Sequence, residues 1–186
     1  CRSGDIFNNK EISDIKIFQS MSQLKKLHIK FNRKATLYEN IFKGLNNLQK
    51  LTFESNAIRY IEKDAFNDLT NLESIEFVNV DLHKIELGAF NHLKSLKELN
   101  LNGSWNLNFI RSKLEDDESI KTVLNFMFKD LISLELLDLR NCGLKSIEPY
   151  AFNGLEKLRR LNLANNELSN FDRKLLNELK YLEEVN

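Results

Sequence analysis

The chain has 186 residues, of which 27 are basic and 27 acidic, so its formal net charge is zero at neutral pH. Balanced charge removes the long-range attraction that draws basic proteins to nucleic acid or anionic membranes, so we expect neither as a partner. No apolar stretch is long enough to span a bilayer, and no Pro-, Gly- or Ser-rich linker interrupts the chain, which indicates one elongated domain over 1–186.

Residues 1–23 carry no repeat and are predicted to form an irregular N-terminal cap. Beyond them, each segment places apolar residues at offsets 0, 3, 5 and 10, and alternation with polar residues predicts a short strand with one buried face. Asn56, Cys142 and Asn166 stand where the chain leaves that strand, and an Asn amide there can satisfy unpaired backbone groups. The segments open at Leu24, Leu48, Leu72, Leu96, Leu134, Leu158 and Leu182.

The step between openings is 24 residues, except for 38 residues in the fourth segment, so 24–181 holds six repeats and 182–186 begins a seventh. The return half of the repeat carries Ala65-Phe66, Ala89-Phe90 and Ala151-Phe152, whose rings are predicted to stack as an internal column. This pattern resembles the extracellular class of leucine-rich repeats, found in Toll-like receptors and secreted insect immune proteins. The resemblance implies an α/β fold: a right-handed solenoid, or horseshoe, with a parallel β-sheet on the concave face and short helical, 3-10 or extended return segments on the convex face.

The solvent-facing strand positions are predicted to line the concave surface, where a protein partner of complementary charge would bind. Basic residues come first along the solenoid, acidic residues occupy the middle, and the end is mixed. Ordinary exposed charge explains any one of these residues equally well. The predicted binding residues on this face are Lys26, His28, Lys30, Phe31, Glu54, Glu76, Val78, Glu98, Asn100, Leu136, Asp138, Arg140 and Arg160.

The fourth repeat holds the 14 extra residues, in an insertion at about 111–125. Helical spacing behind an acidic run predicts a short amphipathic helix, carried by Ile120, Val123, Leu124 and Met127. Insertions in repeat proteins often bind partners, although a tolerated insertion with a solvated acidic tip has equal weight. The predicted binding residues of this region are Trp105, Glu115, Asp116, Asp117 and Glu118.

Asn102 begins the sequon Asn102-Gly103-Ser104 and is predicted as an N-glycosylation site, whose glycan would obstruct the concave face. Cys1 and Cys142 stand several coils apart, so we predict no disulfide within the chain. For Cys1, a free terminal thiol and the remnant of a cap disulfide remain equally open.

The residues that catalysis or metal binding would need do not converge. The three histidines fall at different repeat offsets, no Cys/His spacing suggests zinc, and no Gly-rich loop suggests phosphate. We therefore expect no enzyme activity, no metal and no cofactor.

The predicted function is an extracellular recognition module, secreted or on a cell surface, that binds a protein or a glycan. The resemblance implies a role in innate immunity or cell-surface signalling. The alternative is a structural or matrix scaffold that assembles through its ends as a homo- or hetero-oligomer.

Overall fold

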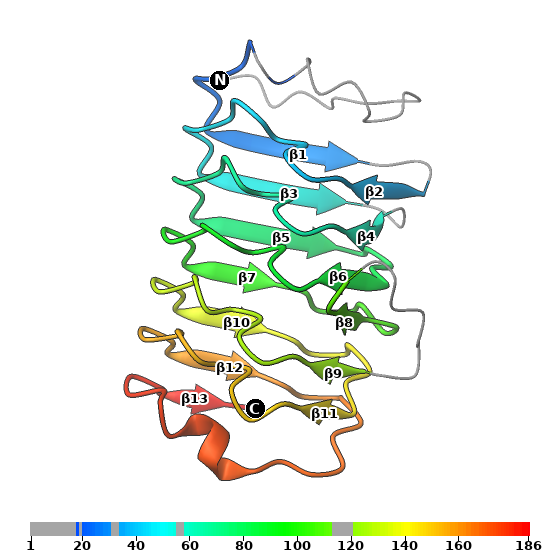
Figure 1. The fold of residues 1–186 in the computed structure, drawn as a ribbon, viewed down its shortest axis with the longest axis vertical. Helices are drawn as coiled ribbons and strands as arrows, with labels where there is room; N and C mark the ends of the chain where they lie inside the picture. The colour runs from blue at the N-terminus through cyan, green and yellow to red at the C-terminus, as the bar shows by residue number, and fades with distance from the viewer. Residues whose placement is uncertain (1–17, 19, 31–33, 55–57, 113–120) are drawn as a thin grey trace.

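Each coil of the chain begins with a strand of one long parallel sheet, the concave sheet (Figure 1). The computed structural model describes residues 18, 20–30, 34–54, 58–112 and 121–186. Side chains alternate between a buried and a solvent-facing side along each strand, as one buried face requires. In order across the sheet, the strands are β1 (Lys26–Lys30), β3 (Lys50–Glu54), β5 (Ser74–Val78), β7 (Glu98–Asn100), β10 (Leu136–Asp138), β12 (Arg160–Asn162) and β13 (Glu184–Val185).

The register of this sheet follows the sequence repeat. Leu27 pairs with Leu51, and Leu51 with Ile75, so equivalent residues stand side by side in successive coils. The insertion does not change the register of the concave sheet, because Leu99 of β7 pairs with Leu137 of β10. The predicted parallel sheet of a leucine-rich-repeat solenoid is therefore confirmed.

The return half of the coils forms a second layer of short strands, the side sheet (Figure 1). Four strands pair in the first part: β2 (Ala35–Leu37), β4 (Ile58–Ile61), β6 (Lys84–Glu86) and β8 (Asn108–Ile110). Two more, β9 (Thr122–Val123) and β11 (Ser146–Ile147), form a separate pair. The insertion thus divides the side sheet in two while the concave sheet runs on without a break.

The helix predicted across the insertion is wrong for the part of the insertion that the structure describes. Val123 lies in strand β9, and residues 125–130 form turns. The apolar residues kept helical spacing because they repeat the ordinary return segment: Val123 occupies the place of Ile85, and Phe128 that of Phe90. Ile120 lies outside the described residues. The described return segments are otherwise extended or turned, apart from the 3-10 helix η2 (Arg173–Leu176).

The predicted column of phenylalanine rings runs through the middle of the core. Phe42 and Phe66 stack with their centroids 5.7 Å apart and their planes 4° from parallel. Phe66 and Phe90 stack at 6.0 Å, and Phe90 meets Phe128 at 6.1 Å across the insertion. Phe152 is buried in the following coil. Each ring therefore packs between the coils before and after it, which ties the coils into one body.

Side chains that reach the neighbouring coil satisfy backbone groups where the chain turns. The Asn166 amide nitrogen donates to the carbonyls of Leu139 and Leu163, both at 2.8 Å. Its oxygen accepts the backbone N–H of Cys142 at 3.0 Å and of Leu144 at 3.1 Å. The predicted role of this asparagine is confirmed.

Glutamate side chains make a second set of contacts to backbone groups of the neighbouring coil, which the sequence analysis did not predict. Glu62, Glu86 and Glu148 each accept a backbone N–H from the preceding coil, at 3.3, 3.1 and 2.6 Å. These residues recur in the return segment at the repeat spacing, but glutamate is so common on surfaces that the pattern alone does not reveal the cap.

Cys142 is a free, fully buried thiol whose Sγ contacts the carbonyl oxygen of Leu101 at 3.3 Å. Burial raises the pKa of this thiol to about 12. At pH 8 the thiolate fraction falls roughly a thousandfold relative to an ordinary cysteine.

We expect iodoacetamide to leave Cys142 unmodified in the folded Cys1→Ser variant and to alkylate it in urea, as measured by intact mass. Rapid alkylation of the folded protein would contradict this packing.

Candidate functional site

Ion pairs between neighbouring strands cover the first part of the concave sheet. Lys30 lies 3.0 Å and His28 2.9 Å from Glu54, and Lys50 lies 2.9 Å from Glu76. The hydrogen bond and charge of Lys30, followed by His28, lower the pKa of Glu54. The basic and acidic zones predicted from sequence therefore neutralise each other in large part. Such exposed pairs contribute little to stability, and they leave little net charge for a partner.

Three predicted residues of this face keep unpaired charges. Within the described ranges, Lys26, Glu98 and Arg160 are exposed and have no ion-pair partner. They stand on β1, β7 and β12, no two of which are adjacent, and they differ in sign, so they do not form one patch of like charge. Charge alone therefore does not define a site on the concave sheet.

The concave strands change length between β5 and β7. β1, β3 and β5 have five residues, whereas β7, β10 and β12 have three. The short strands end on Asn100, Asp138 and Asn162, whose side-chain oxygens accept the backbone N–H two residues later at 3.0, 3.1 and 3.1 Å. Such Asx turns bend the chain away from the strand. Two predicted binding residues, Asn100 and Asp138, thus also terminate strands.

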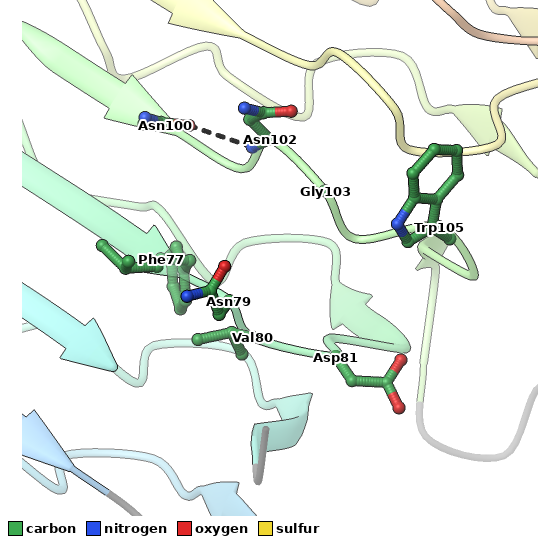
Figure 2. A pocket seen from close by; sticks show the side chains of 9 residues that line it. Phe77, Asn79, Val80, Asp81, Asn100, Asn102, Gly103 and Trp105 are labelled. Atoms are coloured by element: carbon green, nitrogen blue, oxygen red, sulfur yellow. Dashed lines mark hydrogen bonds between the residues drawn. The ribbon is translucent and has the colours of Figure 1, made fainter. Parts of the chain in front are cut away.

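A hollow of about 460 Å³ lies at this change of strand length (Figure 2). Because β5 continues to Val78 while β7 stops at Asn100, the last residues of β5 lose their neighbour on that side. Gly103 adopts a positive φ of 86° as the chain turns away, and Trp105 follows at the end of the hollow away from Phe77. The lining residues are Phe77, Val78, Asn79, Val80, Asp81, Asn100, Asn102, Gly103 and Trp105.

Two large apolar side chains of this hollow face solvent. Val78 is 42% and Trp105 62% exposed, although Phe77 and Val80, which also line the hollow, are buried. Asn79, Asn100 and Asn102 add amides that both donate and accept hydrogen bonds. A concave, partly apolar surface with a few amides and an accessible tryptophan has the composition of a recognition site. We call this set of lining residues the β5–β7 hollow.

A second, smaller hollow of about 160 Å³ lies between β10, β12 and β13. Its Asp138 carboxylate binds Arg140 in a two-point ion pair at 2.7–3.0 Å, and this contact raises the pKa of the guanidinium. Asp138 and Arg140 neutralise each other. Arg160 is therefore the cation of this hollow that has no ion-pair partner among the described residues. Four predicted residues meet here: Leu136, Asp138, Arg140 and Arg160.

The structure thus separates the predicted site residues into groups. Val78, Asn100, Asn102 and Trp105 meet in the β5–β7 hollow, although they came from three different predictions. The sequence prediction missed Val80 and Asp81, because only the path of the chain after β5 brings them to this hollow. Phe31 and the acidic run Glu115, Asp116, Asp117 and Glu118 lie outside the described residues.

The sequon residues pack against the next coil. Asn102 is half-buried and its side-chain oxygen accepts a hydrogen bond from the Asn141 amide at 2.9 Å, while Ser104 is fully buried. Asn102 stands beyond the end of β7 and therefore at the edge of the concave sheet rather than in its centre. Its glycosylation stays a prediction.

Two classes of feature are absent from the described ranges. There, no group of three or more His, Cys, Asp or Glu side chains is arranged to hold a metal ion. Nor does any described helix combine the length and apolar character needed to cross a bilayer.

Fold and repeat together define a repeat solenoid of parallel strands, and comparison with protein families agrees. The family model for the BspA type leucine rich repeat region (6 copies) matches residues 10–114, and a leucine rich repeat model matches residues 132–186. The chain belongs to the leucine-rich repeat family. No curated protein matches it by sequence.

Solved structures with the same fold include Toll of Drosophila. The chain matches the Toll–Spatzle complex with a TM-score of 0.71 and 25% identity over 92% of its own length, and the glycosylated form of that complex with 0.72 and 24% over 94%. It spans 21% of the matched chain in both cases. The TLR13–ssRNA13 complex gives a TM-score of only 0.39 at 21% identity, over 95% of this chain and 34% of the other. The Toll matches agree with the predicted resemblance to Toll-like receptors.

Proposed function

We propose that this chain is a non-enzymatic, extracellular recognition module that binds a protein partner in innate immunity or cell-surface signalling. The observation that carries this proposal is the β5–β7 hollow, in which exposed Trp105 and Val78 flank a concave surface. Tryptophan is the residue type most enriched among side chains that dominate binding energy at protein interfaces. The matched Toll structure is itself a complex with the protein Spatzle, which supports a protein as the partner class.

The distribution of histidines supports a binding role rather than catalysis. His28 lies in β1, His83 precedes β6, and His92 lies in the turn before β7. No described cysteine thiolate is available as a nucleophile, since Cys142 is buried and its pKa is raised. Extracellular localisation and the exclusion of nucleic acid as a ligand are parts of the proposal, resting on the family resemblance and on the balanced charge.

Site-specific photo-crosslinking tests the partner and the place together. A photoreactive phenylalanine analogue at position 78 is expected to trap a discrete protein from the extracellular fluid of the source organism. The same analogue at position 129, an exposed lysine in the return turn, serves as the control. Because alanine at a buried interface tryptophan typically costs at least about 2 kcal/mol, Trp105→Ala should lower the yield of the adduct roughly 30-fold.

Equal adduct yields from positions 78 and 129, or a yield that Trp105→Ala does not change, would place the binding site elsewhere.

Sedimentation of the purified chain tests the alternative function, a structural scaffold. A monomer at micromolar concentration agrees with a recognition module, whereas a stable dimer would favour assembly through the ends, where Phe171 and Val185 are exposed.

A further inference from the structure

Asparagine is followed by glycine twice in the chain, at Asn102-Gly103 and at Asn153-Gly154. An asparagine loses ammonia when the backbone nitrogen of the next residue attacks its side-chain carbonyl carbon, and glycine obstructs that approach least because it has no Cβ. The reaction needs an asparagine side chain that can turn and a backbone N–H that no other group holds. The two pairs differ in both respects.

The Asn102-Gly103 pair is held at both reacting groups. The Asn102 side-chain oxygen accepts a hydrogen bond from the Asn141 amide at 2.9 Å. The Gly103 N–H donates to the Arg140 carbonyl oxygen at 3.0 Å. Both hydrogen bonds have to break before the Gly103 nitrogen can reach the Asn102 side chain, so the fold protects this asparagine.

The Asn153-Gly154 pair has neither contact. Asn153 is exposed in the return turn 151–154, and its side chain and the Gly154 N–H have no hydrogen-bond partner among the described residues. Gly154 adopts a positive φ of 96°, and a Cβ there would stand 2.3 Å from the Lys129 carbonyl oxygen. The packing of this turn therefore requires glycine, the residue that makes the preceding asparagine most reactive.

The equivalent asparagines of earlier coils are bound. The Asn67 amide donates to the side-chain oxygen of Asn40 at 3.3 Å, and the Asn91 amide donates to that of Asp64 at the same distance. In both cases the acceptor lies 27 residues before the asparagine. The same spacing before Asn153 leads to position 126, which is a phenylalanine.

Phe126 explains why the Asn153 side chain is unbound. It has a positive φ of 59°, like the acceptor residues of the earlier coils, but its side chain carries no oxygen. Its ring stacks on Tyr150 instead, with the centroids 5.9 Å apart and the planes 4° from parallel. An aromatic contact thus replaces the amide acceptor in this coil.

We propose that Asn153 is a site of spontaneous deamidation in the folded protein. The Gly154 nitrogen gives its proton to hydroxide and attacks Asn153 Cγ, and the side-chain nitrogen takes a proton from water and leaves as ammonia. The product is a five-membered succinimide, and no oxidant or reductant takes part. Water then breaks the bond from the ring nitrogen to Cγ, which gives aspartate, or the bond to the Asn153 backbone carbonyl carbon, which gives isoaspartate.

Both products change the return turn. Aspartate introduces a negative charge one coil from Lys129, the exposed lysine at the equivalent place. Isoaspartate carries the main chain through the side-chain carbon and lengthens it by one methylene. Because Gly154 packs closely against the Lys129 backbone, we expect the isoaspartate form to melt at a lower temperature than the parent protein.

Peptide mapping of the folded protein, kept at mildly alkaline pH, tests the proposal, and Asn102 serves as the internal control. We expect Asn153 to convert to aspartate and isoaspartate, which mass spectrometry and chromatography of the peptide detect. Conversion at Asn102 should be at least about 10-fold slower, because two hydrogen bonds must break first. In urea, which removes the fold, the two asparagines should convert at similar rates.

Phe126→Asn tests the cause, with Phe126→Ala as the matched control. Both variants lose the stack on Tyr150, but only asparagine restores the acceptor of the earlier coils, so it should slow conversion of Asn153 about 2- to 10-fold relative to alanine. Melting curves check that both variants are folded. Should either not fold, the comparison of Asn153 with Asn102 in the parent protein decides.

Three results would overturn the proposal. The first is that Asn153 stays intact in the folded protein over the time in which the urea-unfolded chain converts. The second is that Asn102 converts as fast as Asn153 in the folded protein. The third is that the folded Phe126→Asn and Phe126→Ala variants convert at the same rate.

Discussion

Replacing Phe66 with alanine is expected to lower the free energy of unfolding by about 3–5 kcal/mol, the usual cost of emptying a buried phenylalanine site. Phe66 is fully buried and stacks on Phe42 at 5.7 Å and on Phe90 at 6.0 Å. Neighbouring rings in adjacent coils cannot close the gap without breaking the register of the concave sheet. The loss should appear as a fall of roughly 6–20 °C in melting temperature.

Circular dichroism during urea unfolding measures this effect, and Phe171→Ala is the matched control. Phe171 is 37% exposed, so its truncation should cost about 1 kcal/mol or less. Trp105, the one tryptophan of the chain, reports on the middle of the solenoid by fluorescence. Coincident circular dichroism and fluorescence transitions would show that the coils unfold together. Equal losses for the two variants would contradict the central place of the ring column.

The second large effect is expected from Asn166→Ala, which should destabilise the fold by about 2–4 kcal/mol because several backbone groups lose their partner together. The side chain satisfies two N–H groups and two carbonyls at distances of 2.8–3.1 Å. Alanine leaves the N–H groups of Cys142 and Leu144 without an acceptor. Thermal unfolding of the variant measures the loss.

Two further variants separate the parts of the Asn166 contact. Asn166→Asp keeps an acceptor for the two N–H groups but removes both donors, so its stability should lie between those of the parent and the alanine variant. Asn170→Ala changes an exposed asparagine four residues later and should be neutral within about 0.5 kcal/mol. If Asn166→Ala proved as mild as Asn170→Ala, solvent would be replacing the amide at little cost.

The scaffold was predictable because each buried position recurs. Leu51, Phe66 and Asn166 hold places that the repeat dictates, and the structure puts them in the sheet, the ring column and the turn. The helix predicted across the insertion is wrong because Val123 and Phe128 belong to an ordinary return segment, whose apolar spacing matches that of a helix. Periodicity alone cannot distinguish these two origins.

The candidate site was predictable only in its parts. Val78 and Trp105 were each singled out, but the hollow between them exists because Asn100 ends β7 two residues before the point that β5 reaches. That difference depends on one Asx turn. The neutralisation of Glu54 by Lys30 and His28 likewise depends on which strands are neighbours and on their register. Both effects arise between coils rather than within the repeat.

The divided side sheet has a mechanical consequence. Hydrogen bonds link β2, β4, β6 and β8 on one side of the insertion and β9 with β11 on the other, whereas the concave sheet joins all seven of its strands. The solenoid should be stiff where both the concave sheet and the side sheet are continuous, and easier to bend where only the concave sheet is. We therefore expect thermal bending of the described solenoid to concentrate at the boundary between β8 and β9. A partner that contacts the coils on both sides of that boundary would restrict this bending and so fix the curvature of the concave face.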